Sequence, residues 1–269
     1  MIANVLSIAG SDPSGGAGIQ ADIKAISANG AYAMAALTAL TAQNTKGVTG
    51  VHLVPPEFVR AQVQTVFDDI EVHAIKIGMI ANAAIAGAVA EAISDRPNSP
   101  IVLDPVMIAK GGAPLLEPDA IETLRGTLLP RAEVLTPNLP EAAHLLERPV
   151  AKARAEMAEH ARALLDLGPS AILLKGGHLE GPDSPDCLVT QDDIVWFEAP
   201  RKDTANTHGT GCTLSAALAA QMAQGHDLSD AVAKAKAYVA QAIVAADQLS
   251  VGHGHGPTHH FIQLWKANS

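Results

Sequence analysis

The chain has 269 residues, 48% of them hydrophobic, and a formal net charge of −10 at pH 7. Its length accommodates one large α/β domain or two smaller ones, and its acidic balance argues against nonspecific binding to nucleic acid or anionic membranes, because no basic surplus neutralises phosphates. Two cysteines do not make a disulfide framework, and the sequence has neither a signal-peptide pattern nor a membrane-spanning run, so we expect a cytoplasmic protein.

Short apolar runs alternate with helical patterns through the first two thirds of the chain. The runs predict buried strands, and the segments between them carry apolar residues at helical spacing. Strands are expected at 4–10, 73–80, 101–108, 132–138 and 170–177, and the apolar run 33–44 ends in a polar tip. Helices are expected at 18–30, 55–70, 82–95, 117–129 and 151–167.

The pattern changes after Gly177. Residues 186–200 predict a hairpin of two strands around the turn "QDD", and two alanine-rich helices follow at about 210–224 and 228–249. Continuous apolar strands between helices favour an α/β fold with three layers, in which helices cover both faces of a mainly parallel central sheet. Because no internal repeat or linker divides the chain, we expect a single domain over residues 1–269.

Polar residues follow most of the predicted strands directly. In parallel sheets, ligands bind outside the carboxyl ends of the strands. The polar ends are Gly10–Gly18, Gln43–Asn44, Gly78–Met79, Asp104–Gly112, Asn138–Glu141 and Lys175–His178. We expect these segments to converge on one edge of the sheet.

The loop GSDPSGGAGIQA contains Gly16-Ala17-Gly18-Ile19-Gln20-Ala21, which matches the G-x-G-x-x-A pattern of dinucleotide-binding proteins. That pattern also needs an acidic residue about twenty positions on for the ribose hydroxyls. After Asp22 the next acidic residue is Glu57, so an NAD site is disfavoured. The P-loop pattern G-x-x-x-x-G-K-[ST] does not occur.

The stretch NTHGTGCTLS, residues 206–215, places a Gly-Thr-Gly turn and a cysteine at the expected start of a helix. Glycine allows close approach of the backbone, and a helix N-terminus offers unpaired N–H groups with a positive dipole end. The turn therefore favours an anion, most often a phosphate, and the same field should lower the pKa of Cys212. A glycine turn followed by a small buried residue explains this stretch equally well without a ligand.

The whole chain resembles the ribokinase-like superfamily and, within it, the bacterial hydroxymethylpyrimidine/phosphomethylpyrimidine kinases of thiamine synthesis. The order and spacing of the shared motifs are specific as a set. They are IAGSDPSGGAGIQADIK, TALTAQNTKGV, IKIGMI, VLDPVM, LTPNLPEA, LLKGGH, THGTGCTLSAALAA and GHGHGP.

The resemblance implies a kinase that uses ATP and Mg²⁺. Such an enzyme phosphorylates the hydroxyl of 4-amino-5-hydroxymethyl-2-methylpyrimidine, and then converts the monophosphate to the diphosphate. The implied substrate contacts are Gln43, Ala17, Met79, Val106 and Asp22. The implied phosphate contacts are Lys175, Gly209, Thr210 and Gly211, and the implied metal-site acids are Asp104 and Glu141. Cys212 and Lys175 are the implied catalytic residues, and a homodimer is expected.

Each implied role has a structural alternative. The Gln43 amide suits a ring nitrogen beside an exocyclic amine, but it also suits a strand end. Asp104 and Glu141 could be a turn residue and a first-turn helix acid. Many superfamily members carry Asp where this chain has Cys212, which is expected to face the attacking oxygen as a base.

Two functional alternatives and a minor site remain open. A pyridoxal or pyridoxine kinase differs only in the ring that it accepts, and a non-catalytic binder of a vitamin precursor would retain the ligand contacts. His253, His255, His259 and His260 lie in a Gly/Pro-containing tail, where a metal site is a minor possibility. Cys187, in the hairpin, is expected to be a small buried apolar residue.

Overall fold

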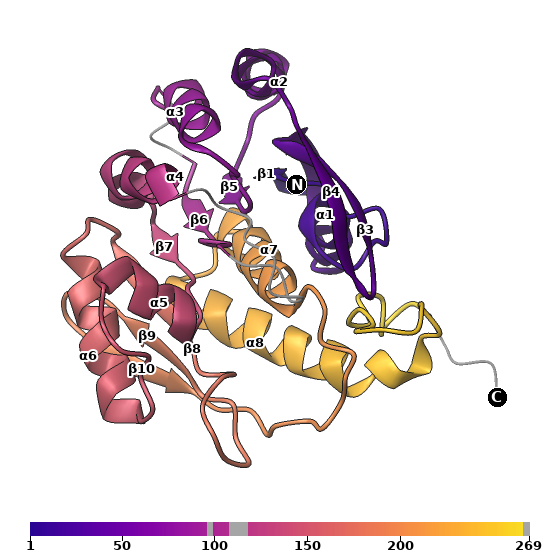
Figure 1. Ribbon diagram of the computed structural model, residues 1–269, viewed down its shortest axis with the longest axis vertical. Coiled ribbons are helices and arrows are strands. Elements are labelled where there is room, and N and C mark those ends of the chain that lie inside the picture. Colours follow the sequence, from indigo (N-terminus) through magenta and orange to yellow (C-terminus); the bar gives the residue numbers. More distant parts are fainter. Residues whose placement is uncertain (96–98, 108–117, 266–269) are drawn as a thin grey trace.

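The computed structural model describes residues 1–95, 99–107 and 118–265. Its centre is an eight-stranded sheet with the order β10-β9-β8-β7-β6-β5-β1-β2 (Figure 1). Neighbouring strands from β2 to β8 are parallel, whereas β9 and β10 are antiparallel. The strands are β1 (Asn4–Ala9), β2 (Tyr32–Leu37), β5 (Ala74–Ile77), β6 (Ile101–Leu103), β7 (Val134–Leu135), β8 (Ala171–Lys175), β9 (Asp186–Val189) and β10 (Ile194–Phe197).

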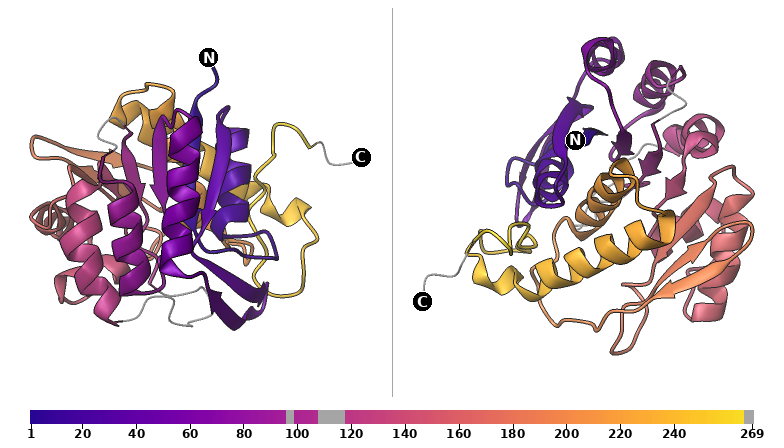
Figure 2. Two further views of the ribbon diagram at one scale, coloured as in Figure 1. Left: turned by 90° about the horizontal axis from the view of Figure 1, so that it is seen from above. Right: turned by 180° about the vertical axis from the view of Figure 1, so that it is seen from behind.

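Helices cover both faces of this sheet, which gives three layers (Figures 1 and 2). One face carries α1 (Gly18–Ala28), α7 (Thr210–Ala223) and α8 (Leu228–Val244). The other carries α2 (Pro56–Asp69), α3 (Ala83–Ala92), α4 (Pro118–Thr123), α5 (Leu139–Leu146) and α6 (Arg154–Leu165). A π-helical turn, Leu124–Leu128, and a 3₁₀ turn, Leu129–Arg131, follow α4, and a 3₁₀ turn at Ala246–Gln248 follows α8. The expected α/β architecture is confirmed.

The side chains of each strand alternate between two apolar clusters, one on each face. In β5, Ile75 and Ile77 belong to the cluster under α2–α6, whereas Ala74 belongs to the cluster under α1, α7 and α8. The remaining residue of β5, Lys76, shares the face of Ala74 by this alternation. A lysine therefore enters the layer beneath α7, where its side chain is fully buried.

The expected strands and helices are largely confirmed, with three differences. The apolar run 33–44 divides at Thr38 into β2 and β3 (Ala39–Asn44), because the Thr38 hydroxyl is buried and donates to the carbonyl of Met79. β3 pairs with β4 (Gly47–Leu53) in a separate two-stranded antiparallel sheet, and β4 was missed because its exposed residues carry no buried pattern.

The third difference is α5, which the sequence interpretation left without an element. Pro140 made a helix harder to recognise in the sequence, because proline usually interrupts helices. Here it lies in the first turn of α5, where proline is tolerated. The ends of two expected elements, residues 108 and 117, lie outside the described residues. Within the described ranges, no helix is long and apolar enough to cross a membrane.

Candidate active site at the carboxyl edge of the sheet

The Gly-Thr-Gly turn caps the central helix α7. Gly209 is the N-cap residue with φ of 75°, a backbone conformation that favours glycine. Its α-carbon lies against the backbone of Gly16, so the turn and the first loop are in direct contact. The Thr210 hydroxyl donates to the carbonyl of Thr207 at 2.8 Å and fixes the turn. The first N–H groups of α7 therefore lie beside the glycine-rich loop, in an arrangement suited to an anion.

A lysine and an aspartate meet the same helix end. Lys175, the last residue of β8, donates from Nζ to Oδ1 of Asp104 at 2.8 Å. A β-carbon on Gly211 would lie 3.3 Å from that Nζ and 3.5 Å from Oδ2 of Asp104, so both charges adjoin the turn. The Ser215 hydroxyl, one turn into α7, donates to Oδ2 of Asp104 at 3.3 Å. The expected convergence of the β6 and β8 ends on the Gly-Thr-Gly turn is confirmed.

Glu141 joins this cluster from the first turn of α5. Its carboxylate and the Asn138 side chain form a capping box, in which Asn138 N–H donates to Oε2 of Glu141 at 2.8 Å. Burial raises the pKa of Glu141 to about 7, with Lys175 opposing that shift and Asp104 adding to it. Part of the expected polar stretch at Asp104–Gly112 lies outside the described residues.

The acids of this cluster fit a magnesium ion. Mg²⁺ prefers oxygen ligands and keeps several waters, so one or two protein carboxylates suffice. Asp104 and Glu141 supply those oxygens at the edge of the sheet, and the raised pKa of Glu141 beside Asp104 marks a place that a cation would stabilise. In the described part of the chain, no three His, Cys, Asp or Glu side chains gather as an all-protein metal cage.

A second network links the first loop to Gln43. The Asp12 carboxylate accepts from the backbone N–H of Ala17 at 2.8 Å and from Nε2 of His208 at 2.7 Å. The same ring nitrogen lies 3.3 Å from Nε2 of Gln43 on β3. Burial raises the pKa of Asp12, but hydrogen bonds from His208 and Ser14 outweigh it, so the pKa lies below its usual value and the carboxylate is ionised.

The Cys212 side chain lies in the first turn of α7, as expected, but its ionisation differs from the prediction. Burial raises the pKa of the thiol to about 11, while Lys76 opposes the shift and the Asp22 and Asp104 charges add to it. The expected lowering was wrong because it counted the helix dipole and left out desolvation, which disfavours a thiolate. Cys212 is therefore a neutral thiol at pH 7.

Residues 12–259 match the family model described as phosphomethylpyrimidine kinase. The chain belongs to the phosphomethylpyrimidine kinase family. The hydroxymethylpyrimidine/phosphomethylpyrimidine kinase of Escherichia coli K12 is 53% identical over 262 residues, which cover 97% of this chain and 98% of that protein. The family is one of kinases, and the matched residues include the α7 turn.

Solved structures agree with this assignment. A phosphomethylpyrimidine kinase from Clostridium difficile is 40% identical, with a TM-score of 0.80 and coverage of 90% of this chain and 99% of that one. A pyridoxal kinase from Staphylococcus aureus, in complex with AMP-PCP and pyridoxal, is 32% identical, with a TM-score of 0.89 and coverage of 98% and 95%. The ribokinase-like fold and the use of ATP are thereby established.

The remaining substrate residues expected from the family resemblance occupy different environments. Ala17 is the N-cap of α1 beside Gly16, and Met79 is buried with its sulfur against Gly10. Val106 follows Asp104 in a tight turn and is partly buried. These three lie on the loops that surround the α7 turn.

Asp22, the remaining residue implied as a substrate contact, is buried within the protein. Its side chain is fully buried, and both carboxylate oxygens accept from Nζ of Lys76, at 2.9 and 2.8 Å. The carboxylate thus lies enclosed between α1 and β5, and its contact with a substrate stays a prediction. The sequence interpretation also missed Lys76, Asp12 and His208. Two of these could have been noticed from their positions. His208 directly precedes Gly209, and Asp12 follows the end of β1.

The C-terminal tail packs against the site loops. The backbone N–H of His208 donates to the carbonyl of Gly256 at 3.0 Å, and that of His255 donates to the carbonyl of Thr45 at 2.8 Å. His260 is buried, with Nε2 3.0 Å from the Thr213 hydroxyl, and burial lowers its pKa to about 4. Cys187 is buried in β9, as expected.

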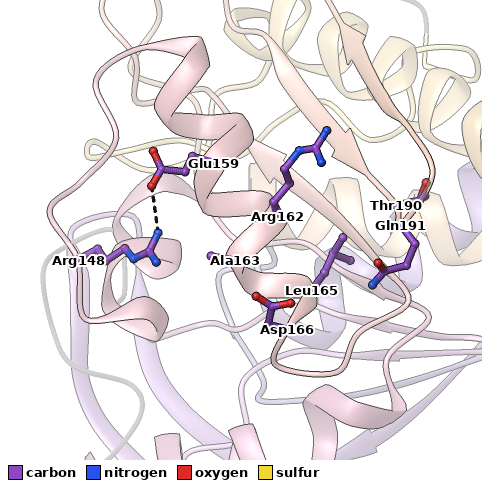
Figure 3. A pocket seen from close by; sticks show the side chains of 8 residues that line it. All are labelled: Arg148, Glu159, Arg162, Ala163, Leu165, Asp166, Thr190 and Gln191. Atoms are coloured by element: carbon purple, nitrogen blue, oxygen red, sulfur yellow. Dashed lines mark hydrogen bonds and ion pairs between the residues drawn. The ribbon is translucent and has the colours of Figure 1, made fainter.

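A separate surface pocket of about 350 Å³ lies away from this site (Figure 3). It is lined by Arg148, Glu159, Arg162, Ala163, Leu165, Asp166, Thr190 and Gln191. Val189 pairs with Ile172 near the start of β8, so the adjoining turn at Thr190 lies at the amino ends of the parallel strands. This pocket is at the opposite edge of the sheet from Lys175, and its Arg148–Glu159 ion pair is exposed.

Proposed function

We propose that this chain transfers the γ-phosphoryl group of ATP to the hydroxyl of 4-amino-5-hydroxymethyl-2-methylpyrimidine, and then to the monophosphate formed, in thiamine biosynthesis. Family membership over residues 12–259 supports the reaction. The observation that carries it in the structure is the contact of Lys175, Asp104 and the Gly211 turn at the start of α7.

The phosphates would lie between the first turn of α7 and Lys175. The N–H groups of the turn and the Lys175 ammonium supply donors and positive charge to a group that becomes more negative during transfer. Asp104 and Glu141 would hold Mg²⁺ together with water, and the ion, when bound, would neutralise charge on the phosphate oxygens. Burial alone would lower the pKa of Lys175, but Asp104 and Glu141 raise it above its ordinary value, so the lysine stays charged.

Cys212 would act on the substrate hydroxyl. With a pKa of about 11 the thiol is seldom ionised at neutral pH, but the thiolate that does form is a strong base. Because only a small fraction of Cys212 is ionised, the basicity of the thiolate accelerates the reaction only in part. Positioning and charge stabilisation would therefore supply most of the rate.

The aminopyrimidine would be read by the Gln43 amide, which offers a donor and an acceptor side by side. The Asp12–His208 pair lies beside that amide, in the loops around the α7 turn. Ala17, Met79 and Val106 lie on the loops around the α7 turn and would contact the pyrimidine ring.

A pyridoxal kinase is the second function that an observation favours, because the Staphylococcus aureus pyridoxal kinase has a TM-score of 0.89. A phosphorus NMR assay with ATP, Mg²⁺ and each ring alcohol separates the two. We expect a monophosphate and then a diphosphate from the hydroxymethylpyrimidine. Phosphorylation of pyridoxal with no diphosphate from the pyrimidine would contradict the first proposal.

A homodimer remains a prediction, supported by exposed apolar side chains near one edge of the sheet. Leu40, Val51 and Leu53 on the β3–β4 sheet and Phe58 on α2 are each at least 36% exposed. Light scattering coupled to gel filtration should give twice the chain mass, and Val51→Asp should reduce it. The single domain over residues 1–269 and the cytoplasmic location also stay predictions.

A further inference from the structure

A complete ion pair is buried beneath the α7 turn. Lys76 on β5 and Asp22 on α1 both have fully buried side chains, and the ammonium donates to both carboxylate oxygens. The Ser7 hydroxyl, on β1, donates to Oδ2 of Asp22 at 2.6 Å. A β-carbon on Gly78 would lie 2.6 Å from Nζ of Lys76, so the backbone of Gly78 approaches the ammonium closely. Three elements of the fold thus fix this pair in place.

The pair lies in the layer that contains Cys212. α7 packs directly against α1, β1 and β5, the elements that carry Asp22, Ser7 and Lys76. The backbone N–H of Gly18, one helical turn before Asp22 on α1, donates toward the Cys212 sulfur. The thiol is therefore close to the N-terminus of α1, the helix that carries Asp22.

Four charged groups act on the Cys212 sulfur from the elements around it. Lys76 has the largest influence of these charges and favours the thiolate, whereas Asp22 and Asp104 oppose it. Lys175, at the end of β8, also interacts with the thiol. Although burial alone would lower the pKa of Lys76, the charges of Asp22 and Asp104 raise it above its ordinary value, so Lys76 is charged. Of the two charges in the buried pair, that of Lys76 therefore acts more strongly on the sulfur than that of Asp22.

Stability alone gives a weak reason for this pair. Removing two charges from water is costly, and well-packed apolar residues in place of a buried ion pair are often neutral or stabilising. Asp22 has a structural effect of its own, because it supplies the only acceptors recorded for the Lys76 ammonium in the described residues. Without Asp22, a buried lysine would tend to lose its charge.

We propose that Lys76 is a positioning residue for phosphoryl transfer, which stabilises negative charge on the Cys212 sulfur while Asp22 holds its ammonium in place. This inference rests on the proposed role of Cys212. The thiol first releases its proton to solvent. The thiolate then takes the proton of the substrate hydroxyl, forming S–H as O–H breaks, while the oxygen bonds to the γ-phosphorus and the bond to the ADP oxygen breaks.

The test replaces the whole pair, so that no unpaired charge remains buried. Two double variants remove both charges: Asp22→Asn/Lys76→Met and Asp22→Asn/Lys76→Gln. The second retains two hydrogen-bonding amides and is used if the first does not fold. The matched control is Asp186→Asn/Lys236→Met, which removes another buried Lys–Asp pair, 2.6 Å between charged atoms. Neither control residue is among the groups that shift the Cys212 pKa. All variants carry Cys187→Ala, so that iodoacetamide reports on Cys212.

Alkylation is followed by intact mass at about pH 8–9, where the rate is proportional to the thiolate fraction. We expect it to fall about tenfold in the Asp22/Lys76 variants, equivalent to a pKa increase of about one unit, and by less than about twofold in the control. An unchanged rate, or an equal fall in the control, would overturn the assignment of Lys76.

The two phosphorylation rates separate this inference from the function on which it rests. If Cys212 is the base, the Asp22/Lys76 variants should lose more rate with the alcohol than with the monophosphate, whose attacking oxygen is already ionised. Slower alkylation with equal losses in both steps would retain the electrostatic link and reject the base role, and with it the catalytic part of this proposal. Failure of the parent enzyme to phosphorylate the pyrimidine would reject the proposed function itself.

Discussion

The contact between the α7 turn and the first loop can be tested with a single methyl group. Gly209 has φ of 75°, and a β-carbon there would overlap the carbonyl oxygen of Gly16, lie 2.7 Å from the Gly16 carbonyl carbon and 3.1 Å from the α-carbon of Ala17. All three atoms belong to the backbone, so no side-chain rotation relieves the overlap. Gly209→Ala must therefore separate the α7 turn from the loop.

The matched control lies at the other end of the same helix. Gly225 has φ of 84°, but a β-carbon there meets no atom within 4 Å. Gly225→Ala should cost only the left-handed backbone term, about 1–2 kcal/mol. Gly209→Ala adds the cost of overpacking, about 1–3 kcal/mol, which gives about 2–5 kcal/mol in total. A domain stable by about 10 kcal/mol, the middle of the usual range, remains folded after such a loss.

Urea unfolding gives the free energy of unfolding of each variant, and steady-state kinetics give kcat/KM for both phosphorylations. We expect Gly209→Ala to lose about 10²-fold in both steps, because a displacement of about 1 Å at the phosphate turn misplaces the reacting groups. Gly225→Ala should retain its activity. Equal unfolding free energies and equal activities in the two variants would refute the role given to the Gly209–Gly16 contact.

Four other outcomes follow from the site. Gln43→Ala should raise KM for the pyrimidine about tenfold and leave KM for ATP unchanged, since a buried amide contact is worth about 1–3 kcal/mol; an unchanged pyrimidine KM contradicts this. Cys212→Ser should slow the first phosphorylation about 10²–10⁴-fold more than the second, and equal losses would exclude a base. The alkylation rate of Cys212 should rise with pH toward an apparent pKa of about 11, and a plateau near neutrality would contradict the burial argument. Asp104→Asn and Lys175→Met should each lower kcat by about 10²-fold or more with unchanged circular dichroism, whereas loss in proportion to unfolded protein would indicate a structural role.

The layered fold could be predicted from the sequence because its causes are local along the chain. Apolar runs such as 170–177 and the helical spacing of 55–70 depend on neighbouring residues, and the strand ends then place Asp104 and Lys175 at one edge. The turn at Gly209 was also predictable, because two glycines before a helical pattern allow backbone conformations that other residues rarely adopt. The strand β4 was not, since most of its residues are exposed and follow no buried periodicity.

The chemistry of individual site residues was decided by tertiary structure. Asp12 and His208 are separated by 196 positions, and no local pattern pairs them. Asp22 on α1 is paired with Lys76 on β5, 54 positions away, and α7 packs against both elements. The shift of the Cys212 pKa is opposite to the predicted one for the same reason. The sequence determines that a thiol begins a helix, but desolvation and the charges of Lys76, Asp22 and Asp104 act through space, and only packing brings them within range.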